Sequence, residues 1–378
     1  MTGNGISKLD LKRQNRMQIL RLLRDSGPTS RIDIARDIGI TKAAVTVITN
    51  EMIKQGCLYE KGEQAPRGAK LPRGRKKILL DISPTYKMDM GLVLEGDVLS
   101  FGICTLHGEP VEKHTVSIPA EETADEVLTQ IETIYRDLLY KNDLTPGQIT
   151  GLGVCVDETL GESFGTVSLG KRLEEVISLP MAFGSIAEGA ALAECDYWQP
   201  AGEPAGELLA FRCGDVLTCA LVLGAELRRG VHERAASMPE STGVAALLAR
   251  CRDLFSQEAT PELWVAAGGN PGRILPELRR SDAPPLDPPI RDLVAGFLET
   301  RLQAILDAVR LLDPGRVVLL EDGVPGSDAL FNRLAAAAEA QLGELGYPVV
   351  RSRIWGSDRF LAGAALAARE FFLNRGGI

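Results

Sequence analysis

The chain has 378 residues, 45% apolar and 25% charged, and lacks both an apolar leader and any run of 18 apolar residues, so we expect a cytoplasmic protein of two or three domains without a membrane span. Its seven cysteines are scattered without a CxxC pair, which argues against a disulfide framework or a zinc site. The net charge of −9 is unevenly divided: residues 1–82 hold 17 Lys and Arg against 8 Asp and Glu, and the remainder holds 25 against 43. A basic head on an acidic body predicts a nucleic-acid-binding module, with a merely solvated basic surface as the alternative.

Three helices are predicted in the basic head. Apolar residues recur at helical spacing over residues 11–25. Ser30, with Asp33 three residues later, gives a capping-box-like start to a second short helix. Gly39 supplies the left-handed residue of the following turn. A third helix is expected from a Thr cap at 41 to Gln55, so the head has the order of a helix-turn-helix.

The third helix is predicted to expose short polar side chains. Threonine and asparagine can reach base edges in a major groove, alanine can touch a thymine methyl group, and lysine can meet a phosphate. An ordinary amphipathic helix more often exposes glutamate and lysine. The candidate DNA-binding residues of this region are Arg31, Thr41, Lys42, Ala43, Thr46, Thr49 and Asn50.

A basic, turn-rich segment follows between two predicted strands, 58–59 and 78–80. An Arg-Gly-Arg sequence next to a proline can place guanidinium groups in a narrow minor groove. Each piece alone fits a helical hairpin or a flexible linker, whereas the order of all three predicts a winged helix-turn-helix over residues 1–82. The candidate residues of the wing are Arg67, Lys70, Arg73, Arg75, Lys76 and Lys77.

The remainder alternates short strands with amphipathic helices, which predicts two α/β lobes about a cleft. We expect a first lobe over residues 83–185 plus 356–378 and a second lobe, with dimerisation helices, over residues 186–355. The predicted strands are 88–94, 98–106, 110–117, 151–156, 208–212, 216–223, 316–320 and 348–354, and the predicted helices are 124–142, 186–198, 244–255, 290–312, 329–345 and 361–373.

The order of winged helix, basic GRK wing, β-meander and Ala-rich GAALAE helix resembles the ROK family of repressors, open reading frames and sugar kinases. The resemblance covers nearly the whole chain. It implies an α/β fold in which a winged helix-turn-helix precedes a two-lobed, actin-like sugar-kinase body. It further implies a DNA-binding transcriptional regulator, expected to be a repressor that responds to a sugar or derives from a sugar-binding ancestor.

The resemblance also locates the two phosphate-binding turns of the family. In the first, Val93 stands at the aspartate position and Glu95 at a glycine position, where its charge would repel a phosphate. In the second, the GxGxG glycines fall on Asp215, Leu217 and Cys219. Close approach of the backbone to a phosphate needs glycine. We therefore expect neither turn to bind ATP.

The sugar-binding signature of the family falls on residues 185–188, where Ile186 replaces the aspartate that would act as general base. The glutamate and histidine that hold sugar hydroxyls fall near Ser237 and Glu240. Cys251 stands alone where the family has a zinc loop. The resemblance therefore implies a body without kinase activity, cofactor or metal.

The interpretation favoured is a homodimeric or larger repressor that binds a double-stranded DNA operator, because a two-fold operator needs two recognition helices. A sugar-like or other small-molecule effector could bind a changed pocket lined by Glu188, Ser237 and Glu240, or these three residues could be solvated surface. Two alternatives are a sugar kinase of the ROK family with an appended DNA-binding head, and a scaffold that does not bind DNA.

Overall fold

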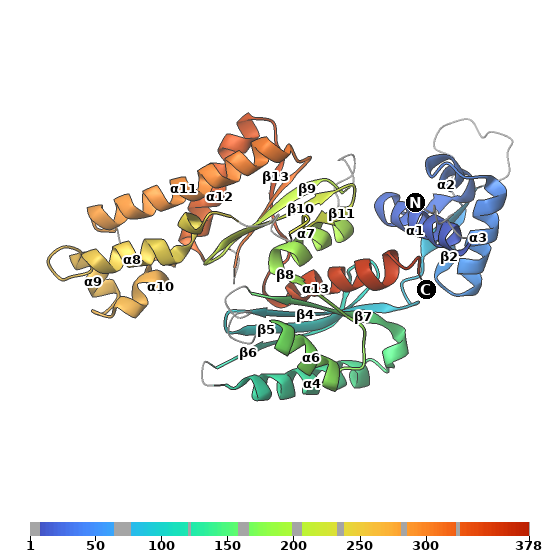
Figure 1. Ribbon diagram of the computed structural model, residues 1–378, viewed down its shortest axis with the longest axis horizontal. Helices are drawn as coiled ribbons and strands as arrows, with labels where there is room; N and C mark the ends of the chain where they lie inside the picture. The colour runs from blue at the N-terminus through green and yellow to red at the C-terminus, as the bar shows by residue number, and fades with distance from the viewer. Residues whose placement is uncertain are drawn as a thin grey trace, which may run out of the picture. The chain divides into compact units, whose positions relative to one another are not determined.

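The computed structural model describes residues 8–63, 77–119, 122–157, 166–198, 206–232, 238–280, 286–322 and 326–377 (Figure 1). The chain divides into two compact units, unit 1 of residues 1–184 with 363–378 and unit 2 of residues 185–362. None of the helices in these described ranges combines the length and the apolar composition that a membrane-spanning helix requires.

The N-terminal part of unit 1, residues 8–82, forms a small helical module that we call the head. A three-stranded sheet with the antiparallel order β1-β3-β2 closes it. Its elements are α1 (Lys8–Ser26), β1 (Thr29–Ser30), α2 (Arg31–Asp37), α3 (Lys42–Lys54), β2 (Leu58–Glu63) and β3 (Ile78–Ile82). The predicted three helices and two wing strands are therefore confirmed, with longer strands than expected.

Local sequence signals place the helices of the head. The Ser30 hydroxyl accepts a hydrogen bond from the Asp33 amide, and the Thr41 hydroxyl accepts one from the Ala44 amide, so each caps the helix that follows it. Gly39 has φ of +72°, the left-handed conformation that the sharp turn between α2 and α3 needs.

The core of the head contains residues from a distant part of the chain. Ile19 and Leu20 of α1, Ile34 of α2 and Met52 of α3 pack together, all fully buried. Phe372 and Leu373 belong to the same cluster. The head therefore completes its core with the end of the last helix of unit 1.

The larger sheet of unit 1 has the order β6-β5-β4-β7-β8, in which β4 pairs antiparallel with β5 and parallel with β7. Helices α4 and α6 cover one face and α13 covers the other (Figure 1). The elements are β4 (Met88–Glu95), β5 (Val98–Thr105), β6 (Pro110–Ser117), α4 (Ala124–Lys141), a 3-10 turn (Pro146–Gln148), β7 (Ile149–Val156), α6 (Thr166–Val176), β8 (Met181–Ser185) and α13 (Phe360–Ala367), which continues as a π-helix (Ala368–Leu373).

Two glycines allow α13 to lie directly on this sheet. A Cβ atom on Gly153 of β7 would stand 1.8 Å from the Gly363 carbonyl oxygen, and one on Gly363 would stand 2.4 Å from the Gly153 oxygen. No side chain fits at either position. The backbone of α13 is therefore fixed against the sheet of unit 1.

Unit 2 holds a second sheet with the order β11-β10-β9-β12-β13. Helix α7 contacts one side of it, and α11 and α12 pack in the large apolar core with β9, β10 and β12 (Figure 1). The elements are α7 (Ile186–Tyr197), β9 (Leu208–Cys213), β10 (Leu217–Leu223), β11 (Glu226–Arg228), a 3-10 turn (Glu240–Thr242), α8 (Val244–Leu254), α9 (Pro261–Ala266), a 3-10 turn (Pro271–Arg273), α10 (Ile274–Arg279), α11 (Pro288–Leu312), β12 (Val317–Leu320), α12 (Ala329–Glu344), β13 (Val349–Arg351) and a 3-10 turn (Gly356–Asp358).

The structure differs from the predicted elements mainly where segments are short. The strand predicted over 348–354 is only Val349–Arg351, because β13 is an edge strand and Ser352 and Arg353 turn to bind the Glu194 carboxylate instead. Helices α6, α9 and α10 and strands β8 and β11 were not predicted, since runs of 3 to 11 residues carry little periodicity.

Candidate nucleic-acid interface

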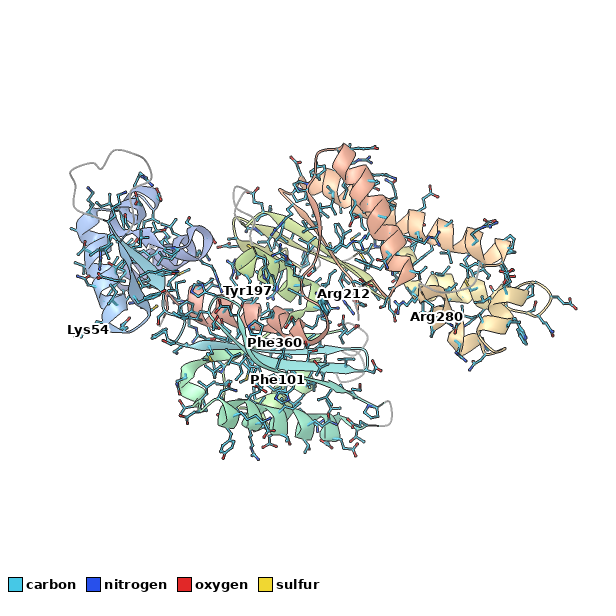
Figure 2. The ribbon with its side chains drawn as sticks, turned by 180° about the vertical axis from the view of Figure 1, so that it is seen from behind. Lys54, Phe101, Tyr197, Arg212, Arg280 and Phe360 are labelled. Atoms are coloured by element: carbon cyan, nitrogen blue, oxygen red, sulfur yellow. The ribbon has the colours of Figure 1, made fainter. Side chains whose placement is uncertain are left out.

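One face of α3 is exposed along its whole length. Ala43, Val47, Asn50 and Lys54 follow the spacing i, i+4, i+7 and i+11, which places them in a line along the helix. All four are exposed, and Val47 is exposed to 66%. Lys54, labelled in Figure 2, is the last residue of the helix. The structure thus brings together a polar and apolar strip that ends in a cation.

Lys42 and Thr46 flank this strip and are also exposed, as predicted. The Thr46 hydroxyl donates a 2.8 Å hydrogen bond to the Lys42 carbonyl oxygen, so its hydrogen is used within the helix. Thr41 is exposed, but its hydroxyl accepts the capping hydrogen bond from Ala44. These two threonines therefore contribute to the helix as well as to its surface.

Thr49 was predicted on the exposed face, and that placement is wrong. The side chain is fully buried, and its hydroxyl donates a 2.8 Å hydrogen bond to the Val45 carbonyl oxygen. The reason is geometric: successive residues turn by about 100°, so the neighbour of Asn50 leaves the exposed strip. Thr49 supports the helix and cannot reach a base edge.

Arg31, at the start of α2, lies between α3 and the sheet of the head. Its guanidinium donates to the Thr49 hydroxyl at 3.2 Å, to Asn50 Oδ1 at 3.1 Å and to the Glu60 carboxylate at 3.1 Å. Arg31 therefore fixes the amide of Asn50 on the exposed face and carries an ion-pair partner of its own.

The predicted wing is only partly described. Strands β2 and β3 pair as expected, whereas Arg67, Lys70, Arg73, Arg75 and Lys76 lie outside the described residues. Lys77 donates to the Asp33 carboxylate at 2.9 and 3.1 Å, which ties β3 to the start of α2. Hydrogen bonding by the Ser30 hydroxyl, followed by that of Lys77, lowers the pKa of Asp33.

Two surface residues of α3 were missed from the sequence, Val47 and Lys54. The helical spacing from Ala43 through Asn50 identifies both, because Val47 and Lys54 continue the same line along the helix. Lys54 matters because a cation at the end of a recognition helix can contact a phosphate. Val47 matters because it is the largest apolar side chain on the strip.

In the body, the predicted sugar-binding signature has become part of a helix cap. The Ser185 hydroxyl accepts from the Glu188 amide at 3.2 Å, and Glu188 accepts from the Ser185 amide at 2.9 Å. Arg229 donates to both carboxylate oxygens of Glu188 at 2.7 and 3.3 Å. Ile186 is fully buried in the first turn of α7. Both carboxylate oxygens of Glu188 thus accept hydrogen bonds from other residues of unit 2.

Charged side chains hold the turn between β9 and β10, where the resemblance predicts the second phosphate-binding turn. Arg301 of α11 is buried and donates to the carbonyl oxygens of Thr242, Gly214 and Asp215 at 2.7, 2.6 and 3.2 Å. Burial lowers its pKa. A Cβ atom on Gly214 would stand 1.8 Å from the Asp322 carboxylate, so that carboxylate packs directly on the turn.

Asp322 is itself paired. Arg212, labelled in Figure 2, donates to its two carboxylate oxygens at 2.8 and 3.1 Å, and the Arg212 side chain is only 3% exposed. Arg212 therefore balances the charge of this carboxylate, which closes the turn by filling the space beside Gly214. Val93, at the aspartate position of the first turn, is buried in the sheet of unit 1.

The remaining predicted pocket residues are not brought together by the described part of the chain. Ser237 lies outside it, and Glu240 is exposed at the start of a 3-10 turn. A small pocket in unit 2 has other walls, among them Phe331, Trp355 and Glu321. Among the described residues, no group of three or more His, Cys, Asp or Glu side chains could hold a metal ion.

Comparison with known proteins relates the head and the body to two kinds of protein. The MarR family profile matches residues 13–60, from α1 into β2. A xylose repressor of Caldicellulosiruptor bescii is 24% identical over 243 residues, which are 61% of this chain and 59% of that protein. The chain thus spans less than two thirds of the length of this curated relative.

Solved structures show the same fold. A ROK family transcriptional regulator, a homologue of the E. coli MLC protein, matches with a TM-score of 0.61 and 17% identity over 97% of both chains. A ROK family glucokinase of Streptomyces griseus, in complex with glucose and AMPPNP, matches 75% of this chain and 99% of its own, with a TM-score of 0.54 and 17% identity. The fold is therefore a winged helix-turn-helix followed by a ROK sugar-kinase-like body.

Proposed function

We propose that this chain is a DNA-binding transcriptional repressor whose head reads double-stranded DNA. The observation that carries the proposal is the exposed face of α3, where Ala43, Val47 and Asn50 lie in line between Lys42 and Lys54. A recognition helix lies in the major groove with its N-terminal residues at base edges and its cations near phosphates. The name of the xylose repressor relative supports the same function.

We further propose that the basic wing segment extends the contact into the minor groove. Arginines inserted in a narrow minor groove sense its negative potential. Arg73 and Arg75 flank a glycine in the segment of the chain between β2 and β3, two strands that pair with each other. The wing and α3 would together give one head a short DNA site, so we propose a homodimer or larger oligomer that reads a two-fold operator in the cytoplasm.

The body, in this proposal, does not transfer phosphate. Ile186 cannot take a proton from a sugar hydroxyl, the Asp322 carboxylate lies on Gly214, and Val93 replaces the aspartate of the first turn. The likeness to ROK kinases concerns the fold and leaves these side chains to decide the chemistry. We propose that the body dimerises and binds a sugar-like or other small-molecule effector.

The test is selection of binding sites from random duplexes by the full chain, followed by affinity measurement on the enriched duplex. We expect Lys42→Ala with Lys54→Ala to weaken binding about tenfold to a hundredfold, since each lost phosphate contact also removes counterion release. Lys171→Ala, an exposed lysine on α6, is the matched control and should bind like wild type. Equal affinity of the double variant and wild type would remove the assignment of α3.

A further inference from the structure

Val47 has an unusual place for a valine. It is 66% exposed in the middle of α3, where a β-branched side chain favours the helix less than alanine or leucine would. Folding therefore gains little from valine at this position. Single exposed apolar residues are common, but here Ala43 lies one turn before Val47 on the same line.

Thr46 extends this apolar surface. Because its hydroxyl donates to the Lys42 carbonyl oxygen, the side chain has a methyl group to offer at the surface and no hydroxyl hydrogen. Ala43, Thr46 and Val47 thus place methyl groups next to one another at the centre of the exposed face. Among the residues of α3 itself, the cations are Lys42 and Lys54, one at each end of the helix.

The chemistry of the major groove gives this strip one natural partner. The thymine C5 methyl is the apolar group that a base pair presents there, whereas guanine is most often read by arginine or lysine. Between Lys42 and Lys54, α3 itself carries no lysine or arginine to read guanine. Asn50 follows with an amide that can bind adenine, and Arg31 holds its Oδ1 at 3.1 Å.

We infer that Val47, with Ala43 and Thr46, reads thymine methyl groups, so that the base pairs facing the centre of α3 are A·T pairs. This inference rests on the proposed function. It adds the class of sequence that the head selects and makes Val47 a specificity-determining residue. Asn50 reads the adenine edge in the same part of the site.

Deoxyuridine tests the inference directly, because it pairs like thymine but lacks the methyl group. Each thymine of the selected duplex is replaced singly, and the Kd of wild type and of Val47→Ala is measured for every duplex. Where the replaced thymine is the one that contacts Val47, we expect the affinity of the wild-type protein to fall about fourfold. This is the effect of about 0.8 kcal/mol for one buried methyl group. Val47→Ala should bind the thymine duplex more weakly and ignore that replacement.

The control variant is Val265→Ala in α9 of unit 2, a valine that is 77% exposed. It should keep the wild-type response to every deoxyuridine. Val47→Ala should remain folded, since alanine favours an exposed helical position. Sites without central A·T pairs, or full deoxyuridine sensitivity in Val47→Ala, would overturn the thymine reading alone. Failure of wild type to select any duplex would overturn the proposed function itself.

Discussion

The guanidinium of Arg16 in α1 donates a 2.7 Å hydrogen bond to the Gly376 carbonyl oxygen, 360 residues further along the chain. The Arg16 side chain is 1% exposed, and its other N–H groups reach the Gly377 carbonyl oxygen at 3.3 Å and Gln55 Oε1 at 2.8 Å. A buried guanidinium needs such acceptors, so the hydrogen bonds of Arg16 hold residues 376 and 377 against the head. Arg13 adds two hydrogen bonds to the Asn374 carbonyl oxygen, at 2.8 and 3.2 Å.

Gly377→Ala is expected to loosen the head. Gly377 has φ of +72°, and a Cβ atom there would stand 2.8 Å from Cys57 Sγ and 3.1 Å from a Leu20 methyl group. Strain and overpacking together should cost about 1–3 kcal/mol. We expect faster hydrogen exchange in α1 and α3 and weaker operator binding.

The matched control is Gly343→Ala in α12. A Cβ atom on Gly343 meets nothing within 4 Å, and the residue is exposed in a helix, so alanine should be neutral or stabilise by up to about 1 kcal/mol. All three tryptophans, Trp198, Trp264 and Trp355, lie in unit 2. Their fluorescence should therefore report an unchanged unit 2 in Gly377→Ala. If hydrogen exchange in the head of Gly377→Ala were as slow as in wild type, residues 374–377 would not stabilise the head.

Thr49→Ala and Asn50→Ala should separate folding from recognition, although the residues are adjacent. Thr49 is buried and bonded to Val45 and Arg31, so its loss should cost about 1 kcal/mol of stability. Asn50 is exposed, so its loss should leave stability nearly unchanged but weaken operator binding about fivefold to a hundredfold, the equivalent of about 1–3 kcal/mol for a base contact. Thermal unfolding and fluorescence anisotropy measure the two effects. The reverse pattern would restore Thr49 to the interface.

The head could be predicted from the sequence because its signals are local. Ser30, Gly39 and Thr41 act within four residues of where they stand, and the structure confirms each. Thr49 is buried because that side of α3 packs against the rest of the head, where Arg31 of α2 contacts it, and its residue type alone does not predict this. The hydrogen bonds between α1 and residues 374–377 connect parts that are about 360 residues apart in the sequence, and no local pattern predicts them.

The body shows the same limit. Flanking motifs predict that Val93 and Ile186 stand at functional positions of the family, and the structure shows that both side chains are buried. The contacts that replace the lost chemistry could not be predicted. Arg301 reaches the β9–β10 turn from another helix, and Asp322 packs on Gly214 from another strand end. Such contacts depend on the packing of elements that are far apart in the sequence.

Arg73→Ala with Arg75→Ala should weaken operator binding at least tenfold while the oligomer stays intact. If each arginine displaces counterions from DNA, the slope of log affinity against log salt should fall by about 0.9 per lost contact. Anisotropy titrations at several salt concentrations measure the slope, and sedimentation measures the oligomer. Arg136→Ala in α4, with a side chain exposed to 73%, is the control. An unchanged slope in the double variant would show that the wing does not contact DNA.

ATP with Mg²⁺ should neither bind nor shift the melting temperature. The Asp322 carboxylate fills the space beside the Gly214 backbone, so a phosphate could not contact that backbone unless Asp322 moved. Calorimetry with the full chain measures the affinity, and micromolar binding would contradict the proposal of a non-catalytic body. Asp322→Ala should destabilise unit 2 by about 3 kcal/mol, because it leaves the buried Arg212 guanidinium without this carboxylate.

Glu194 should give unit 2 a stability that falls as pH rises above about 4. The side chain is 2% exposed, and burial raises its pKa, although the Arg353 amide and the Ser352 hydroxyl hydrogen-bond to its Oε1 at 2.7 and 2.9 Å. Between the unfolded pKa and the raised folded pKa, the native state binds more protons than the unfolded state. The free energy of unfolding therefore decreases through this window, and the contribution is complete only below the unfolded pKa.

Glu194→Gln removes this titration and keeps an oxygen acceptor at the same site. We expect the stability of wild type relative to Glu194→Gln to decrease from about pH 4 toward neutral pH, measured by urea unfolding followed through tryptophan fluorescence, which reports unit 2. Other carboxylates contribute equally to both proteins, so their effects cancel in this comparison. Among them is Asp33, whose pKa is shifted in the opposite direction, downward. A difference that stays constant with pH would mean that the hydrogen bonds from Ser352 and Arg353 offset the burial of the carboxylate.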